Sequence, residues 1–565
     1  MRGAAALVRS PLKCRTGHRA PIDTGPILSG KGILVLALLA CALPAQAQTA
    51  LPADQAAIKA HVQFLASDAL RGREAGTPDH DRAAEYVAAK MLAAGLRPAG
   101  ENGSWFQPVR LTRYQPADKP RWTLTRGGSA IPLQFGIDFI NGAIPATPAF
   151  AAQGGIVFAG YGLVYPAEQI DDYRGLDVKG KIVAILGGLP ADITGDVAAH
   201  LADDDQKARF AEARGAKAVI VLESAERRAE MPFESIVPFW NYPRWGWAGP
   251  DGRPNMIAPG APVVGYLGQT GAEKLFAGSA IRWRDVLAAE RHGTPMPHGA
   301  LPGTLAVSSR TNVSVRQSRN VVGLLPGSDP ALASQYVVLS AHLDHVGVGQ
   351  SVHGDSIYNG AMDNAVGVAM VLEAARALQA SGKRPRRSIL FVALTAEEKG
   401  LIGSDYFAHH PTVPQGSLAA NINLDMPILT YKLEDLVILG GERSSLGPAL
   451  TAAAATEGLK TVPDPEPEEM FFVRSDHYSF VQSGIPAVSV DTGPGGEGLA
   501  AQRLFLDNHY HKPSDDISLP FHWDSAARYL RVITAGARSI ADAPERPRWN
   551  KGDFFGVQFK GYGAE

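Results

Sequence analysis

The stretch from Ala341 to Gly367, AHLDHVGVGQSVHGDSIYNGAMDNAVG, combines acid and imidazole side chains in one glycine-rich segment between two apolar segments. These side chains are His342, Asp344, His345, Asp355 and Asp363. Burying such groups is costly unless a partner compensates them. A metal ion is one such partner. If a metal binds here, the rest of the chain must supply further ligands.

Further acid and imidazole residues stand where predicted strands end. Apolar runs end at His342 (336–342), at Glu397 and Glu398 (387–398) and at Asp425 (420–426). Asp363 directly precedes a predicted helix at 364–382, and His511 lies in a loop after the last predicted strand, 485–493. Sites in open α/β sheets form outside the carboxyl ends of the strands. We therefore expect these side chains to converge.

Such a set of ligands suits two divalent metal ions, which together form a common hydrolytic device. Zinc accepts imidazole nitrogen and carboxylate oxygen, while cobalt or manganese would also suit these ligands. Five residues supply enough ligands for two ions if Asp363 bridges them: His342, Asp363, Glu398, Asp425 and His511. Glu397, beside a ligand but free itself, is the predicted general base.

The elements that must position these residues alternate between apolar strands and amphipathic helices from about residue 305. This alternation predicts an α/β fold with a mostly parallel central sheet covered by helices. Helices are also predicted at 53–66, 78–98 and 524–543. A separate, smaller α/β unit begins near Gly154. The Trp- and Pro-rich segment 231–254 is predicted to be a structured loop packing on that unit, with cleft lining or a subunit contact as alternatives.

Composition and the N-terminus restrict the possible functions. A chain of 565 residues predicts more than one domain, and a net charge of −2 without a basic run argues against a nucleic-acid binder. Lys31, the apolar run 33–40 and the motif Ala-Gln-Ala at 45–47 predict a signal peptide cleaved after Ala47. We expect an exported protein, periplasmic or secreted, with no stable membrane span after cleavage. An uncleaved anchor and lipid modification of Cys41 are the alternatives.

Both cysteines, Cys14 and Cys41, lie in this N-terminal region. The mature chain would contain neither a disulfide nor a thiolate ligand, so histidine and carboxylate side chains must hold any metal.

Several segments together resemble the di-zinc aminopeptidase family that includes bacterial leucyl aminopeptidase and aminopeptidase S, with glutamate carboxypeptidase II as a distant relative. These segments are SDALRGREAGTP, AHLDHVG, GAMDNAVG, LTAEEKGLIGS, NLDM, RSDHYSFVQSGIPA and YHKPSD. The unit containing DVKGKIVAI and GAKAVIVL resembles a protease-associated domain inserted in the peptidase fold.

The resemblance implies the following domains: a signal peptide at 1–47, an N-terminal part of the peptidase domain at 48–135, an inserted protease-associated domain at 136–300, a catalytic metallopeptidase domain at 301–545 and a C-terminal tail at 546–565.

The resemblance also implies a role for each site residue. His342 and Asp425 hold one zinc ion, Glu398 and His511 hold the other, and Asp363 bridges both. Glu397 is the base that takes a proton from the attacking water, and Asp344 is the acid that orients the histidine ligand. His345 has no ligand role in the family and is not included.

Two further positions bear on the site. Met362 stands where the family often has an aspartate, which removes a negative charge beside the bridging ligand. Tyr478 is either an oxyanion stabiliser or a core residue beside the loop, and the sequence leaves both possibilities open.

The first functional hypothesis is an exported di-zinc aminopeptidase that hydrolyses the N-terminal bond of peptides with a free N-terminus. A zinc carboxypeptidase or dipeptidase acting on acidic peptides is the second. It needs a cationic pocket, and Arg474 stands near the expected loop without a cluster of further arginines. The third is a non-catalytic, receptor-like binding protein, which a loss of ligands would mark; every predicted ligand is present. Substrate side-chain preference and oligomeric state stay undetermined.

Overall fold

A mixed sheet that is parallel at its centre organises the part of the chain that contains the predicted site residues. The computed structural model describes residues 50–565, so the predicted signal peptide and Cys41 lie outside the described residues. Four strands run side by side and parallel in the order β17 (Ser388–Leu394), β14 (Tyr336–His342), β18 (Leu418–Asn423) and β21 (Ala487–Thr492). Their side chains are almost all buried, as expected for strands covered on both faces.

Antiparallel strands extend this sheet at both edges. Beyond β21 lie β19 (Asp435–Leu439), antiparallel to it, and β20 (Lys460–Val462). Beyond β17 lie β13 (Gly299–Leu325), β2 (Phe106–Pro116) and β11 (Arg244–Ala248), each antiparallel to its neighbour. The sheet is therefore mixed and mostly parallel at its core, which confirms the predicted fold class.

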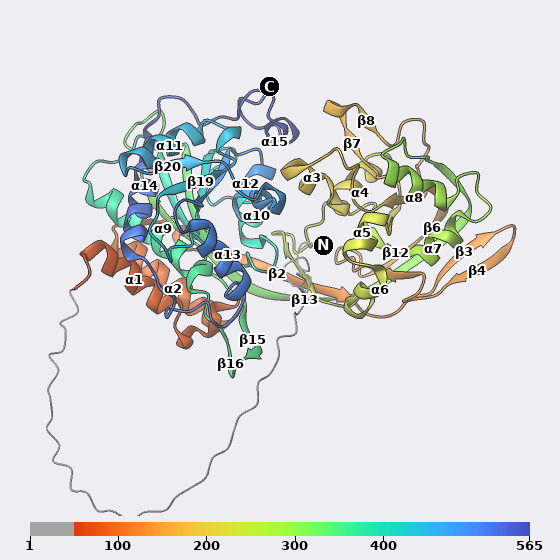
Figure 1. The fold of residues 1–565 in the computed structure, drawn as a ribbon, viewed down its shortest axis with the longest axis horizontal. Helices are drawn as coiled ribbons and strands as arrows, with labels where there is room; N and C mark the ends of the chain where they lie inside the picture. The colour runs from red at the N-terminus through yellow and green to blue at the C-terminus, as the bar shows by residue number, and fades with distance from the viewer. Residues whose placement is uncertain (1–49) are drawn as a thin grey trace, which may run out of the picture.

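Helices cover both faces of the central sheet (Figure 1). One apolar cluster joins the sheet to α1 (Ala53–Leu65), α2 (Pro78–Ala93), α9 (Val366–Ala380), α11 (Leu446–Thr456) and α14 (Trp523–Asp542). A second cluster, on the other face, includes residues of α10 (Ile402–His409), α12 (His477–Gln482) and α15 (Phe554–Gln558). The long helices α1, α2, α9 and α14 lie where apolar periodicity predicts them.

Residues 117–310, apart from 244–248, form a second lobe with its own sheet. Its parallel strands are β6 (Ala149–Phe158), β9 (Ile182–Leu186), β10 (Ala218–Leu222) and β12 (Val263–Leu267). Three further strands join them: β3 (Trp122–Arg126), β4 (Ser129–Leu133) and β5 (Phe139–Asn141). Its longer helices are α3 (Gly195–Leu201), α4 (Asp204–Glu212), α7 (Gln269–Phe276) and α8 (Trp283–His292). Because β3 and β4 belong to this sheet, the lobe begins before residue 136.

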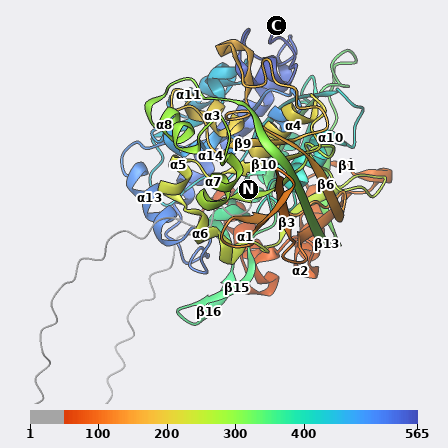
Figure 2. The same ribbon diagram turned by 90° about the vertical axis from the view of Figure 1, so that its right-hand side faces the viewer.

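One long strand joins the two lobes. The first half of β13, residues 299–310, pairs with β6 of the second lobe, and the rest pairs with β2 and β17 of the first. Figure 1 shows β2 and β13 crossing between the lobes, and Figure 2 shows β13 from the side of the second lobe. This shared strand could not be predicted from local sequence, because both sheets contribute its partners.

The Trp-rich segment also links the lobes. Its residues 244–248 form β11 on β2, and Trp247 Nε1 donates a hydrogen bond to Asp405 Oδ2 on α10 over 2.8 Å. The segment therefore contributes a strand to the first lobe's sheet instead of only packing on the second lobe.

The last residues are part of the core, which corrects the prediction of an irregular tail. Trp549 and Phe555 are 1% and 0% exposed, and α15 packs beside α12. In residues 50–565, no helix combines the length and the apolar character that crossing a bilayer requires.

Candidate active site

The predicted ligands meet at the carboxyl edge of the parallel strands. His342 is the last residue of β14, while Glu397 and Glu398 follow β17 and Asp425 follows β18. Asp363 lies in the short helical segment Ala361–Ala365 that leads into α9. His511 follows α13 (Gly498–Asn508). Neighbouring parallel strands end at one edge of a sheet, so these residues from distant parts of the chain lie close together.

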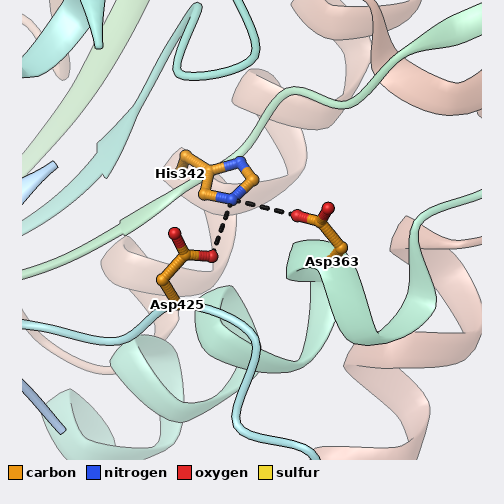
Figure 3. Close-up of side chains that lie close together, drawn as sticks. All are labelled: His342, Asp363 and Asp425. Atoms are coloured by element: carbon orange, nitrogen blue, oxygen red, sulfur yellow. Dashed lines mark hydrogen bonds and ion pairs between the residues drawn. The ribbon is translucent and has the colours of Figure 1, made fainter. Parts of the chain in front are cut away.

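His342 forms the first group with two carboxylates (Figure 3). Its Nε2 lies 3.2 Å from Asp363 Oδ1 and 3.0 Å from Asp425 Oδ1. All three side chains are at least 85% buried. One imidazole nitrogen and two carboxylate oxygens thus face a common point.

A second group forms around the other oxygen of Asp363. His511 Nε2 lies 3.3 Å from Asp363 Oδ2 and 2.9 Å from Glu398 Oε2. The two oxygens of Asp363 therefore face different histidines, which is the arrangement that a bridging carboxylate requires.

The donor atoms fit metal ions in type and spacing. In a tetrahedral zinc site with ligand distances of 2.0–2.2 Å, neighbouring donor atoms lie roughly 3.3–3.6 Å apart, so donor pairs a few tenths of an ångström closer need only a small outward shift to hold an ion. The four distances above run from 2.9 to 3.3 Å. The residues are therefore suited to holding two cations on either side of Asp363.

Buried carboxylates also explain the protonation of the two histidines. Burial lowers the pKa of His511, but Glu398 and Asp363 outweigh it and raise that pKa to about 11. Burial likewise opposes the charge of His342, whose pKa Asp425 and Asp363 nevertheless raise well above its usual value. The negative charge that raises these two pKa values is the charge that bound cations would balance.

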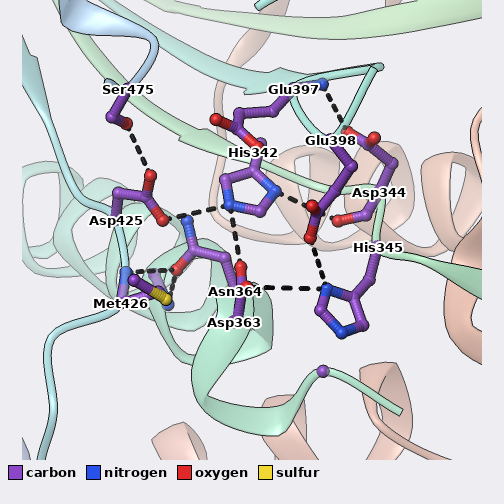
Figure 4. Close-up of polar contacts among 12 residues, drawn as sticks. His342, Asp344, His345, Asp363, Asn364, Glu397, Glu398, Asp425, Met426 and Ser475 are labelled. Atoms are coloured by element: carbon purple, nitrogen blue, oxygen red, sulfur yellow. Dashed lines mark hydrogen bonds and ion pairs between the residues drawn. The ribbon is translucent and has the colours of Figure 1, made fainter. Parts of the chain in front are cut away.

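His345, which the sequence analysis did not include, belongs to this site. Its Nδ1 lies 2.6 Å from Glu398 Oε1 and 3.7 Å from Asp363 Oδ2, and it forms a possible metal-binding group with both (Figure 4). Because Glu398 meets His511 through Oε2 and His345 through Oε1, His345 fixes the orientation of that carboxylate. Its place in the motif HLDH, three residues after His342, was the available signal.

Asp344 contacts its neighbours differently from the prediction. His342 Nδ1 meets the backbone carbonyl of Asp344 at 3.0 Å, not its carboxylate. The carboxylate Oδ1 accepts the backbone N–H of Glu397 over 3.1 Å instead. The carbonyl of Asp344 faces the imidazole, while its buried side chain anchors the loop after β17. Asp344 thus positions both His342 and Glu397.

Hydrogen bonds orient Asp425 from outside the cluster. Ser475 Oγ donates to Asp425 Oδ2 over 2.5 Å, and Asn423 Nδ2 donates to Ser475 Oγ over 2.9 Å. Asn364 Nδ2 donates to the carbonyl of Leu424 over 2.8 Å, joining the Asp363 segment to the Asp425 segment. Such outer partners fix the geometry of metal ligands.

Two buried charged residues, which the sequence analysis did not single out, support the ligand segments. Asp515 accepts the backbone N–H groups of Met362 at 2.8 Å and Asp363 at 3.0 Å. The Arg73 guanidinium donates to the carbonyls of Leu343 at 2.9 Å and Gly360 at 3.0 Å. Both residues belong to segments that carry the family resemblance, SDALRGREAGTP and YHKPSD.

The backbone is left-handed at three positions in or beside the site. Ala396 has a φ of 57°, Met426 of 46° and His511 of 52°. These conformations are unfavourable for residues other than glycine and cluster at functional sites. They turn the chain so that Glu397, Asp425 and His511 face the centre.

Three residues considered in the sequence analysis lie outside the cluster. Asp355 is exposed on β16 (Asp355–Tyr358) and accepts the N–H of Ile357. The Tyr478 hydroxyl lies 2.7 Å from His200 Nδ1 of the second lobe, so Tyr478 is a contact between lobes. Arg474 is 42% exposed and pairs with Glu469 at 3.2 Å.

Comparisons with known proteins point to one family. Residues 320–537 match Peptidase family M28. Aminopeptidase YwaD of Bacillus subtilis (strain 168) is 26% identical over 462 residues, which cover 80% of this chain and 77% of that protein. The probable glutamate carboxypeptidase VP8 of Zea mays is 26% identical over 360 residues, 58% of this chain and 44% of that protein.

Among solved structures, an aminopeptidase from Aneurinibacillus sp. strain AM-1 matches 87% of this chain and 95% of its own, with 21% identity and a TM-score of 0.44. The family match spans every predicted ligand, from His342 to His511, together with Asp344 and Glu397. Residues 320–537 of this chain, which hold the candidate site, are therefore similar to peptidase family M28.

Proposed function

We propose that this chain is a metallo-aminopeptidase that hydrolyses the N-terminal bond of peptides with a free amino group, using two zinc ions. The observation that carries the proposal is the two-sided cluster around Asp363, whose two oxygens face His342 and His511. Glu397 lies in the same group of side chains as Asp363 (Figure 4). Histidine and carboxylate ligands suit zinc. The name of the relative from Bacillus subtilis, an aminopeptidase, supports the choice of reaction.

His342, Asp363 and Asp425 would hold one ion, and Asp363, Glu398 and His511 the other. When bound, two divalent ions polarise the scissile carbonyl and lower the pKa of the attacking water. The protein's part is to fix the ligands, which the contacts of Asp344, His345, Ser475 and Asp515 accomplish.

Glu397 is the proposed general base. Burial raises its pKa well above the usual value, an effect that His342 opposes and that Asp425 and Glu398 reinforce. The raised pKa makes Glu397 a stronger base than an exposed carboxylate. It accepts a proton from the attacking water and passes it to the amine that leaves.

An acidic surrounding favours a substrate amino group over a substrate carboxylate. A pocket beside Asp425 is also lined by Asp464, Glu466 and Asp491, and no lysine or arginine is among its described lining residues. A carboxypeptidase acting on acidic peptides needs cations there, because guanidinium groups are the usual partners of substrate carboxylates. The lining therefore supports the aminopeptidase.

The proposal includes export. Its support is the sequence pattern of the first 47 residues, a basic flank, an apolar run and a small-residue cleavage motif. The protein would then meet peptides in the periplasm or outside the cell.

Peptides with free and with acetylated N-termini test the reaction. The zinc-loaded mature chain should release amino acids only from the free peptides, since the proposed specificity requires the amino group. Glu397→Gln should lower kcat by about 10²–10⁴-fold while keeping its zinc, because a general base contributes on this scale. The exposed Glu468→Gln is the matched control. Equal cleavage of acetylated peptides, or none by a fully loaded protein, would contradict the proposal.

A further inference from the structure

A pocket opens directly beside the proposed metal ligand Asp425. We call it the acidic pocket and define it by Asp425, Met426, Asp464 and Asp491, which line it together with apolar side chains. A substrate whose scissile bond reaches the metal ions would place a neighbouring side chain near Asp425. The pocket is thus positioned to receive that side chain.

The sheet explains why two of its carboxylates are neighbours. In the parallel pair β18 and β21, Asn423 lies opposite Ser489. Asp425 and Asp491 each follow two residues later, at the carboxyl edge, so both face the same side of the sheet. Asp491 also pairs with Val437 on β19. Its position is therefore set by two neighbouring strands.

Apolar side chains form much of the wall of the acidic pocket. They include Ile428 and Leu439, 5% and 7% exposed, with Phe471 and Leu506. Such walls favour contact with methylene groups, each of which gains free energy on leaving water. An occupant with an aliphatic stem fits them better than a fully polar one.

Two carboxylates of the acidic pocket, Asp464 and Asp491, lack cationic partners among the described residues, whereas Asp425 pairs with His342 at 3.0 Å. Glu466 pairs with Arg503 at 3.0 Å, but neither Asp464 nor Asp491 forms an ion pair within residues 50–565. Asp491 accepts one hydrogen bond, from Ser489 Oγ over 2.9 Å. A cation that enters the pocket would therefore meet two carboxylates, Asp464 and Asp491, that have no cationic partner of their own in the described part of the chain.

We propose that the acidic pocket binds the side chain of a lysine or arginine at the substrate's N-terminus. The apolar walls would hold the aliphatic stem, and Asp464 and Asp491 would face the ammonium or guanidinium group. Long cationic side chains commonly lie with the stem on apolar surface and the charge at polar groups. This inference rests on the proposed aminopeptidase function and adds a substrate class to it.

Aminoacyl p-nitroanilides of lysine, norleucine and leucine test the inference with the zinc-loaded chain. Norleucine has the stem of lysine without the ammonium group, so the ratio of kcat/KM for lysine over norleucine isolates the charge. We expect a ratio of about tenfold or more, since charge-assisted contacts are strong in partly buried sites. Asp491→Asn and Asp464→Asn should each lower it several-fold, and the control Glu468→Gln, outside the pocket lining, should leave it unchanged.

The outcomes separate the possible roles of these carboxylates. A lysine/norleucine ratio near one in the unmodified chain overturns the inference. So does an equal loss for lysine and norleucine substrates in both variants, which would instead assign the carboxylates to the α-ammonium group that all substrates share. Norleucine turnover also reports whether a variant is folded and metal-loaded. If none of the three substrates is cleaved by the loaded chain, the proposed function fails, and the inference fails with it.

Discussion

Asp363 makes two metal positions possible with a single side chain. Its Oδ1 lies 3.2 Å from His342 and its Oδ2 lies 3.3 Å from His511. Glu398 divides its oxygens in the same way, between His511 and His345. Each carboxylate is held from two sides, which keeps the donor atoms in place before a metal arrives. Such preorganisation lowers the cost of assembling the site.

Metal affinity should rise with pH. In the metal-free protein the pKa of His511 is about 11 and that of His342 is well above its usual value, so both imidazoles are protonated at neutral pH. Zinc must displace these protons, and raising the pH makes their release easier. The apparent affinity should therefore increase from pH 6 to pH 9, by up to about tenfold per pH unit for each proton released.

Competition titrations with a chelator of known pH dependence measure this effect. A pH-independent affinity over that range would contradict it, because it would mean that the imidazoles are already neutral in the metal-free protein.

The strands that position the site could be predicted because their apolar runs are long and unbroken. The strands β14, β17, β18 and β21 all lie inside predicted segments or overlap them closely. Once the strands are placed, the rule that sites form at carboxyl ends brings His342, Glu398 and Asp425 together. The place of Asp363 and His511 in the same site could be predicted from their position in loops at that edge and from the family resemblance.

Other features depend on tertiary contacts that local sequence does not reveal. His345 meets Glu398 across 53 positions of the chain, and Asp515 meets the Asp363 segment from beyond α13. The backbone carbonyl of Asp344, not its carboxylate, contacts His342. Trp549 packs into a core built from distant helices, so its segment 546–565 could be predicted only as a tail.

The loop after α13 holds the segment before α9 through Asp515. Its carboxylate accepts the N–H groups of Met362 and Asp363 in a buried position. Asp515→Asn would leave one of these donors without an acceptor, which costs about 1–3 kcal/mol in a buried site. We expect a lower melting temperature and roughly 10- to 100-fold weaker zinc binding, the range typical of lost outer partners.

Asp516→Asn is the matched control for this variant. The Asp516 carboxylate accepts the N–H of Ser518 in its own loop and does not contact the ligand segments. In zinc titrations and thermal unfolding, Asp515→Asn should bind zinc more weakly and melt at a lower temperature than Asp516→Asn. If Asp515→Asn bound zinc like the control, the bridging position of Asp363 would not depend on this loop.

The two lobes meet through charged and aromatic contacts as well as through β13. Arg443 lies 2.7 Å from Asp196 on α3 of the second lobe and 3.3 Å from Asp553 of the first. Its guanidinium also lies over the rings of Phe472 and Phe555, at 4.9 and 5.0 Å. Phe472 belongs to the short helical segment Phe471–Val473, whose first residue lines the acidic pocket. Arg443 therefore contacts both the second lobe and the short segment that supplies Phe471 to the acidic pocket.

Arg443→Ala tests this connection at the level of the whole molecule. Because the guanidinium is 17% exposed and pairs with the carboxylates of Asp196, Glu442 and Asp553, its loss should destabilise the protein by about 2 kcal/mol, between the values for exposed and fully buried pairs. Loss of the contact with Phe472 should loosen the wall at Phe471, raising KM several-fold while kcat changes less. The control Arg531→Ala removes a 47% exposed arginine that pairs with Glu457 and should change neither KM nor melting temperature measurably. If Arg443→Ala lowered stability but left KM unchanged, the lobe contact would serve stability alone and the link to the pocket would be wrong.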